Sequence, residues 1–159
     1  MCMSNVLVRY RGISEMAFYQ NAQELRKELS NLLMRDKVVP KKWRHNVTYP
    51  ALDYMRDMMA LMHKANTIYT NSPELVAQRK AVQGLCIEQC DNLWELLQGA
   101  MQTCWWQKLH AVNKEGQPTQ ERLALEKHLD DIGNLLDYEV RLLQGWQRKT
   151  KLLTPKGAT

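Results

Sequence analysis

The sequence predicts an all-α protein folded as an antiparallel up-down-up-down four-helix bundle. Leu and Met are abundant, Phe occurs once, and Val and Ile are sparse. Unbranched apolar side chains lose little rotamer freedom in a helix, whereas β-branched side chains suit pleated strands. Four segments repeat apolar residues at helical spacing, and fairly short connections join them. Short connections favour antiparallel neighbours in a bundle.

The length suits one domain with one core, since the chain has 159 residues of which 45% are apolar. We expect an N-terminal extension over residues 1–14, the four-helix bundle over residues 15–151 and a flexible C-terminal tail over residues 152–159.

The first helix is expected from Glu15 to Asp36, because Pro40 prevents its continuation. Its apolar stripe has the spacing of one helix face and comprises Phe18, Ala22, Leu25, Leu29 and Leu32.

The second helix is expected to begin near Thr48, with Pro50 in its first turn. We expect Asn66, the polar member of its stripe, to fix the helix register by hydrogen bonding to other helices. The stripe comprises Leu52, Met55, Met59, Met62, Asn66 and Tyr69.

The third helix is expected to start at Ser72 and Pro73, which suit the N-cap and first helical positions, and to reach about Trp106. Its stripe comprises Val82, Cys86, Cys90, Leu93, Leu97, Ala100 and Cys104. After a turn at residues 113–118, the fourth helix is expected from about Thr119 to Lys151. Its stripe comprises Leu125, Leu129, Ile132, Leu136, Val140, Leu143 and Trp146.

No local pattern indicates catalysis. The sequence has no Gly-rich phosphate loop and no nucleophile elbow, and no Glu is followed by His at the spacing that a di-iron bundle needs. We therefore expect a protein that is not an enzyme and that has no cofactor and no metal. Cys86 and Cys90 would supply half of a zinc site, but packing in the core is the favoured interpretation. A solvated helix face is the favoured interpretation of Asp130, Asp131, Asp137 and Glu139.

The first residues carry no signal-peptide pattern, and no apolar run approaches the roughly 18 residues of a membrane span. We expect a cytoplasmic protein with reduced cysteines and no membrane contact.

Positive charge is concentrated in two places. The net charge is +5, yet residues 46–140 carry eight basic and thirteen acidic side chains. Residues 35–45 carry five basic and one acidic, and residues 141–159 carry five basic and none acidic. Basic side chains neutralise phosphates, and an aromatic side chain stacks on an unpaired base. The candidate nucleic-acid-binding residues are Lys37, Lys41, Lys42, Trp43 and Arg44 in a loop, and Arg148, Lys149 and Lys151 near the C-terminus.

The alternative for the loop is a solvated connection whose Trp43 covers the end of the bundle. In a simple bundle the loop and the C-terminal residues lie at opposite ends, so they need not form one surface. The apolar stripes are also wide, which self-association or a broad core face would explain. The residues that widen them include Trp94, Trp105, Trp106 and Trp146.

Several short motifs resemble one bacterial family. They are Pro40-Lys-Lys-Trp-Arg44, Pro50, Ala65-Asn-Thr-Ile-Tyr69, Arg79, Cys90 and Leu142-Leu-Gln-Gly-Trp-Gln-Arg148. Over about residues 15–150 the chain resembles the four-helix-bundle family of the accessory variability protein of diversity-generating retroelements. The ribosomal-RNA intervening-sequence proteins are related to that family.

The resemblance implies a non-enzymatic accessory protein of a bacterium or phage that assembles as a homopentamer. It implies binding of template RNA, or of an RNA/DNA hybrid, and of the retroelement reverse transcriptase, in support of mutagenic cDNA synthesis. Lys41, Lys42 and Arg44 are the basic positions that match the motif, with Arg148 and Lys149 second. The alternative is a helical-bundle protein-interaction module without a nucleic-acid role.

Overall fold

The protein is all-helical. The computed structural model describes residues 11–153, so most of the predicted N-terminal extension and the end of the predicted tail lie outside the described residues. In chain order the elements are α1 (Arg11–Ser14), α2 (Ala17–Leu33), the 3₁₀ turn η2 (Lys41–Trp43), α3 (Thr48–Thr67), α4 (Pro73–Thr103), α5 (Trp106–Leu109) and α6 (Gln120–Lys149). The only β-type pairing among these residues is an isolated bridge between Val112 and Pro118.

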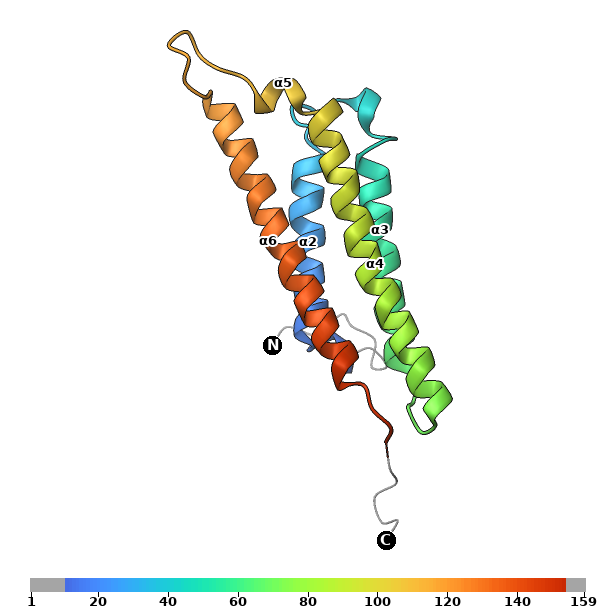
Figure 1. The fold of residues 1–159 in the computed structure, drawn as a ribbon. Coiled ribbons are helices and arrows are strands. Elements are labelled where there is room, and N and C mark those ends of the chain that lie inside the picture. Colours follow the sequence, from blue (N-terminus) through green and yellow to red (C-terminus); the bar gives the residue numbers. More distant parts are fainter. Residues whose placement is uncertain (1–10, 154–159) are drawn as a thin grey trace, which may run out of the picture.

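The four long helices lie side by side along one axis (Figure 1). Helices α2 and α4 each pack against both α3 and α6. The connection between α2 and α3 lies at the same end as α5 and the turn that precedes α6 (Figure 1). The connection between α3 and α4 lies at the other end, where α6 also finishes (Figure 1).

The predicted starts of α4 and α6 are confirmed by side-chain caps. The Ser72 hydroxyl accepts a hydrogen bond from the backbone N–H of Leu75 at 3.3 Å. The Thr119 hydroxyl accepts one from the N–H of Arg122 at 3.2 Å. Each cap satisfies a donor that has no partner within the first helical turn.

The third helix is shorter than predicted, because α4 ends at Thr103 and not near Trp106. The backbone N–H of Trp105 reaches back to the carbonyl of Ala100 at 2.9 Å, one residue further than in a regular α-helix. This wider turn directs the Trp105 side chain inward, where it is fully buried. The short helix α5 then starts in a new direction.

The first helix is also shorter than predicted. It begins at Ala17, because Met16 has an extended conformation, and it ends at Leu33. Beyond that end, the backbone N–H groups of Val38 and Val39 both bond the carbonyl of Arg35 and form a separate turn.

The predicted apolar stripes form most of the core. Every predicted stripe residue of α2 is buried, and so are the stripe residues of α4 from Val82 to Ala100. Cys86 and Cys90 are free thiols within this core, as predicted. Burial raises the pKa of Cys86 to about 12, so its thiol stays protonated and unreactive.

The stripe of α3 is displaced at its end. Ala65 is fully buried, whereas Asn66 is half-buried and Tyr69 is 66% exposed. Asn66 therefore lies at the edge of the core stripe, and Tyr69 lies outside it. Ala51 and Met58 are also buried, so the buried face of α3 is wider than the predicted stripe.

Glu139 is a buried carboxyl in the middle of the helices, so its assignment to a solvated face is wrong. Its Oε2 accepts a hydrogen bond from the side-chain amide of Asn21 at 2.8 Å. The same amide nitrogen donates to the carbonyl of Leu135 at 3.0 Å, which ties α2 to α6. The second carboxyl oxygen has no partner among the described residues. Burial raises the pKa of Glu139 to about 8, so the carboxyl is largely neutral at pH 7.

Replacing Glu139 with Gln should remove a pH dependence of stability. The folded protein holds a proton on Glu139 up to about pH 8, whereas the ordinary pKa is 4.5. The folded state therefore binds more protons than the unfolded chain, and stability falls as pH rises through this window. The expected loss is about 1 kcal/mol per pH unit.

The measurement is the free energy of unfolding in urea between about pH 7 and pH 8, for the wild type and Glu139→Gln. Burial lowers the pKa of His63, so this histidine is already neutral in the range and adds little to the dependence of stability on pH. We expect the wild type alone to lose stability across the range. Equal slopes in the two proteins would show that Glu139 does not carry the effect.

Candidate nucleic-acid interface

The basic loop, defined as residues 37–44, lies at the same end of the helices as α5 (Figure 1). It contains the turn η2, whose first hydrogen bond runs from the N–H of Trp43 to the carbonyl of Pro40 at 2.8 Å. Pro40 has φ −55° and ψ 150°, so it directs the chain from the end of α2 into this turn. Lys41 and Lys42 are thus carried on this turn, whereas Lys37 lies in the preceding turn over residues 35–39.

Three lysines of the basic loop face solvent. Lys37, Lys41 and Lys42 are exposed, and none has an ion-pair partner among residues 11–153. The ammonium group of Lys42 lies 6.0 Å from the centre of the Trp43 ring, at the limit of a cation–π contact. These side chains are available to phosphates.

The side chain of Arg44 is held by contacts with other residues of the protein. Its guanidinium forms an ion pair with Asp36 and donates to the carbonyl of Met34 at 3.1 Å, and its side chain is only 18% exposed. Both partners lie just after the end of α2, so Arg44 closes the loop across that end. Both contacts use Nη2, so this end of the guanidinium is not available to a phosphate.

Trp43 is half-buried and packs against the core cluster. The alternative interpretation, in which this side chain covers the end of the helices, fits its position. Stacking on a base would require the exposed part of the ring.

Two further contacts hold the basic loop to the helices. The indole N–H of Trp105 donates to the carbonyl of Val38 at 3.1 Å. The Thr48 hydroxyl donates to the carbonyl of Leu33 at 2.8 Å and is fully buried. Both carbonyls lie outside regular helix hydrogen bonding, so these donors satisfy them in its place; the carbonyl of Val38 also receives a weak contact from the Cys104 thiol at 4.0 Å.

The C-terminal basic residues lie at the opposite end of the helices from the basic loop (Figure 1). Arg148 and Lys149 are in the last turn of α6, where positive charge favours the helix dipole, and Lys151 follows two residues later. All three are exposed. The structure therefore does not bring the two predicted basic groups together.

Arg79 is a basic residue that the charge pattern missed. Its guanidinium carbon lies 5.5 Å from the centre of the Trp146 ring, and Lys149 and Lys151 line the same small pocket. Arg79 falls in the acidic middle of the sequence, so only folding brings it beside the C-terminal lysines.

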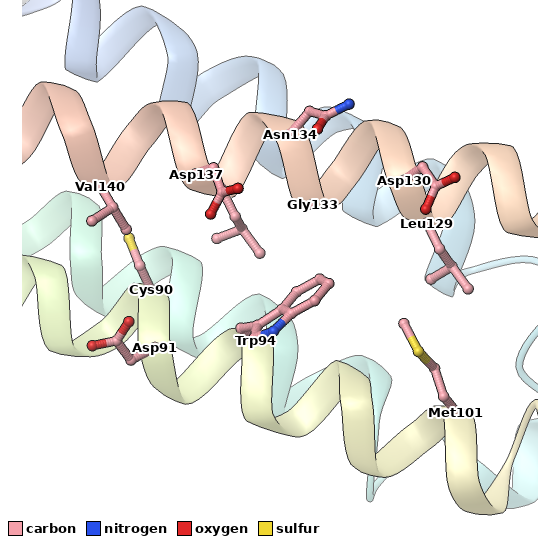
Figure 2. A pocket seen from close by; sticks show the side chains of 11 residues that line it. Cys90, Asp91, Trp94, Met101, Leu129, Asp130, Gly133, Asn134, Asp137 and Val140 are labelled. Carbon is pink, nitrogen blue, oxygen red and sulfur yellow. The ribbon is translucent and has the colours of Figure 1, made fainter.

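A groove of about 630 Å³ runs between α4 and α6 (Figure 2). Trp94 projects from α4 toward Gly133 of α6, where an added Cβ would lie 3.4 Å from the ring (Figure 2). Asp91, Asp130 and Asp137 are exposed at this groove. The groove is therefore acidic with an aromatic floor, and it would repel a phosphate backbone.

No group of His, Cys, Asp and Glu side chains within residues 11–153 is arranged to hold a metal ion. No helix in that range combines the length and apolar character needed to cross a membrane. Comparisons of the chain with family models, curated proteins and solved structures find no match.

Replacing Trp105 with Phe should loosen the basic loop. The change removes the indole donor and leaves the carbonyl of Val38 with only the weak contact of the Cys104 thiol at 4.0 Å, which costs about 1 kcal/mol. Amide hydrogen exchange over residues 35–47 is the direct measurement, and we expect faster exchange there while the middle of α2 and α6 keeps its protection. Unchanged exchange in the loop would contradict the role given to Trp105.

Proposed function

We propose that this chain is a non-enzymatic, nucleic-acid-binding accessory protein that contacts RNA through its basic loop. The observation that carries this proposal is the display of Lys37, Lys41 and Lys42 on an anchored turn without acidic partners among the described residues. Anchoring lowers the entropy lost when lysines bind phosphates. Arg44 then acts as a positioning residue that maintains the turn.

The wider function follows from the family that the sequence resembles. We propose that the RNA is the template of a diversity-generating retroelement, alone or as an RNA/DNA hybrid, and that the protein partner is the retroelement reverse transcriptase. The site of action would be the cytoplasm of a bacterium or a phage-infected cell. A reverse-transcriptase gene beside the gene for this chain is the genomic observation that would support this partner.

The proposed architecture is an antiparallel up-down-up-down four-helix bundle over residues 15–151. Contacts of α2 with α6 support it, because Asn21 bonds Glu139 whereas Glu28, further along α2, bonds His128, earlier in α6. The proposed homopentamer rests on the resemblance. Exposed apolar side chains on different helices, including Leu85, Leu123 and Tyr138, fit a self-associating surface.

A second candidate function is a protein-interaction module without a nucleic-acid role. The acidic groove between α4 and α6 favours it, because its aspartates have no ion-pair partners among the described residues and Trp94 offers an apolar contact. A basic segment of a protein partner has the complementary chemistry.

The RNA site is tested by binding a structured RNA over a series of salt concentrations. Neutralising Lys41→Gln/Lys42→Gln should weaken binding and reduce the slope of log K against log salt by about 0.7–0.9 per lost phosphate contact. Fluorescence anisotropy with labelled RNA gives both quantities.

The matched control is Lys64→Gln/Lys127→Gln, which removes the same charge from exposed positions on α3 and α6. We expect this control to keep nearly the full salt slope of the wild type. Equal slopes and affinities for both double variants would exclude the basic loop as the RNA site and favour the protein-interaction module.

The groove is tested with a synthetic peptide rich in Lys and Arg and with the variant Asp91→Asn/Asp137→Asn. Loss of two exposed carboxylates should slow association with a basic segment by about tenfold at low salt, since rim charges act mainly on the association rate. Surface plasmon resonance measures that rate. An association rate equal to that of the wild type would remove the groove as the partner site.

A further inference from the structure

We propose that the end of the protein opposite the basic loop carries a phosphate-binding pocket built around Arg79. This pocket is separate from the basic loop and from the acidic groove. Its ligand is a phosphoryl group, borne either by a nucleic acid or by a small phosphorylated molecule. Only the nucleic-acid case rests on the proposed function.

The pocket is small and lies between the end of α6 and the connection from α3 to α4. Its volume is about 160 Å³, well below the roughly 300–1,000 Å³ of sites for drug-sized ligands. A single anionic group matches this size better than a whole nucleotide. The lining residues are Thr70, Arg79, Trp146, Lys149, Thr150, Lys151 and Leu153.

Arg79 is a half-buried cation without a carboxylate partner among residues 11–153. Its one hydrogen bond there runs from Nη1 to the carbonyl of Ile68 at 3.3 Å, and its buried Nε has no acceptor. Burial lowers the pKa of the guanidinium, because lost hydration is not offset by a neighbouring negative charge. A guanidinium keeps its charge even so, and an anion would supply the missing partner.

Trp146 orients this cation. The guanidinium carbon of Arg79 lies 5.5 Å from the centre of the indole, within the range of a cation–π contact. The Trp146 ring is itself held by packing, because the Phe18 ring stacks on it with centres 4.1 Å apart. Arg79 therefore contacts an indole whose position is fixed.

The chain that follows α6 is also held in place. The Thr70 hydroxyl donates to the carbonyl of Lys151 at 2.9 Å, and the N–H of Leu153 donates to the carbonyl of Thr70 at 2.8 Å. Thr150 and Gln83 exchange hydrogen bonds of 2.9 and 3.0 Å in a buried pair. These contacts place Lys149 and Lys151 beside Arg79 before any ligand binds.

Charge selects the ligand class. Three basic residues line the pocket and no acidic residue does. A phosphate carries up to two negative charges and several acceptor oxygens, which suit one planar guanidinium and two ammonium groups. A carboxylate or a chloride ion would satisfy fewer of these donors.

The test is a titration of isotope-labelled protein with inorganic phosphate at constant ionic strength. We expect saturable shifts of the Arg79 Nε–H and Trp146 indole N–H resonances. Lys149→Gln/Lys151→Gln should weaken this binding by about tenfold or more. Arg79→Lys, which keeps the charge but loses the planar fork, should weaken it as well.

The matched control is Lys64→Gln/Lys127→Gln, which removes the same charge from exposed positions that line neither this pocket nor the basic loop, and it should leave phosphate affinity unchanged. Shifts that do not saturate, or equal affinities for the two double variants, would show that this pocket does not bind phosphate. Because this readout uses inorganic phosphate, it fails or succeeds independently of RNA binding at the basic loop.

A second arm distinguishes the sources of the phosphoryl group. A short oligoribonucleotide with a 5′-phosphate is compared with the same strand bearing a 5′-hydroxyl, and each is compared with inorganic phosphate. Tighter binding of the phosphorylated strand would support a nucleic-acid terminus as ligand. Binding of inorganic phosphate with no gain from the strand would support a small phosphorylated molecule.

Discussion

The hydrogen bond from the Trp105 indole to the carbonyl of Val38 is the contact on which the candidate interface depends. It requires α4 to end at Thr103, so that residue 105 turns into the core and not along the helix. The same contact holds the chain that leaves α2, and the ion pair of Arg44 with Asp36 closes that turn. The exposure of the lysines at residues 37, 41 and 42 is therefore a consequence of core packing.

Charge is separated along the length of the protein. The basic loop occupies one end and the pocket around Arg79 the other, while the groove between α4 and α6 is acidic. Helix α6 has 30 residues, and a helix of that length spans about 45 Å. Screening at physiological salt acts over about 8 Å, so the charges at the two ends do not interact with each other. An extended polyanion would meet repulsion along the groove.

The helices and most of the core could be predicted, because apolar spacing reports which face is buried. The burial of Glu139 could not be predicted in this way. Glu139 has the spacing of the stripe, since it lies three residues after Leu136 and four before Leu143, but a charged residue at such a position is normally assigned to the surface. Its burial makes sense only once its hydrogen-bond partner, Asn21, is known. The basic loop was found from composition alone. The roles of Arg44 and Arg79 could not be predicted, because each depends on a contact that only the folded chain shows. Arg44 forms an ion pair with Asp36, and Arg79 lies against the Trp146 ring.

The most direct test of RNA binding at the basic loop is photochemical crosslinking of bound RNA, with the crosslinked peptides identified by mass spectrometry. We expect crosslinks to concentrate in the peptide that contains Lys41, Lys42 and Trp43, and to be absent from the faces of α4 and α6 that form the groove. Crosslinks that centre on the groove and spare the loop would contradict the assignment.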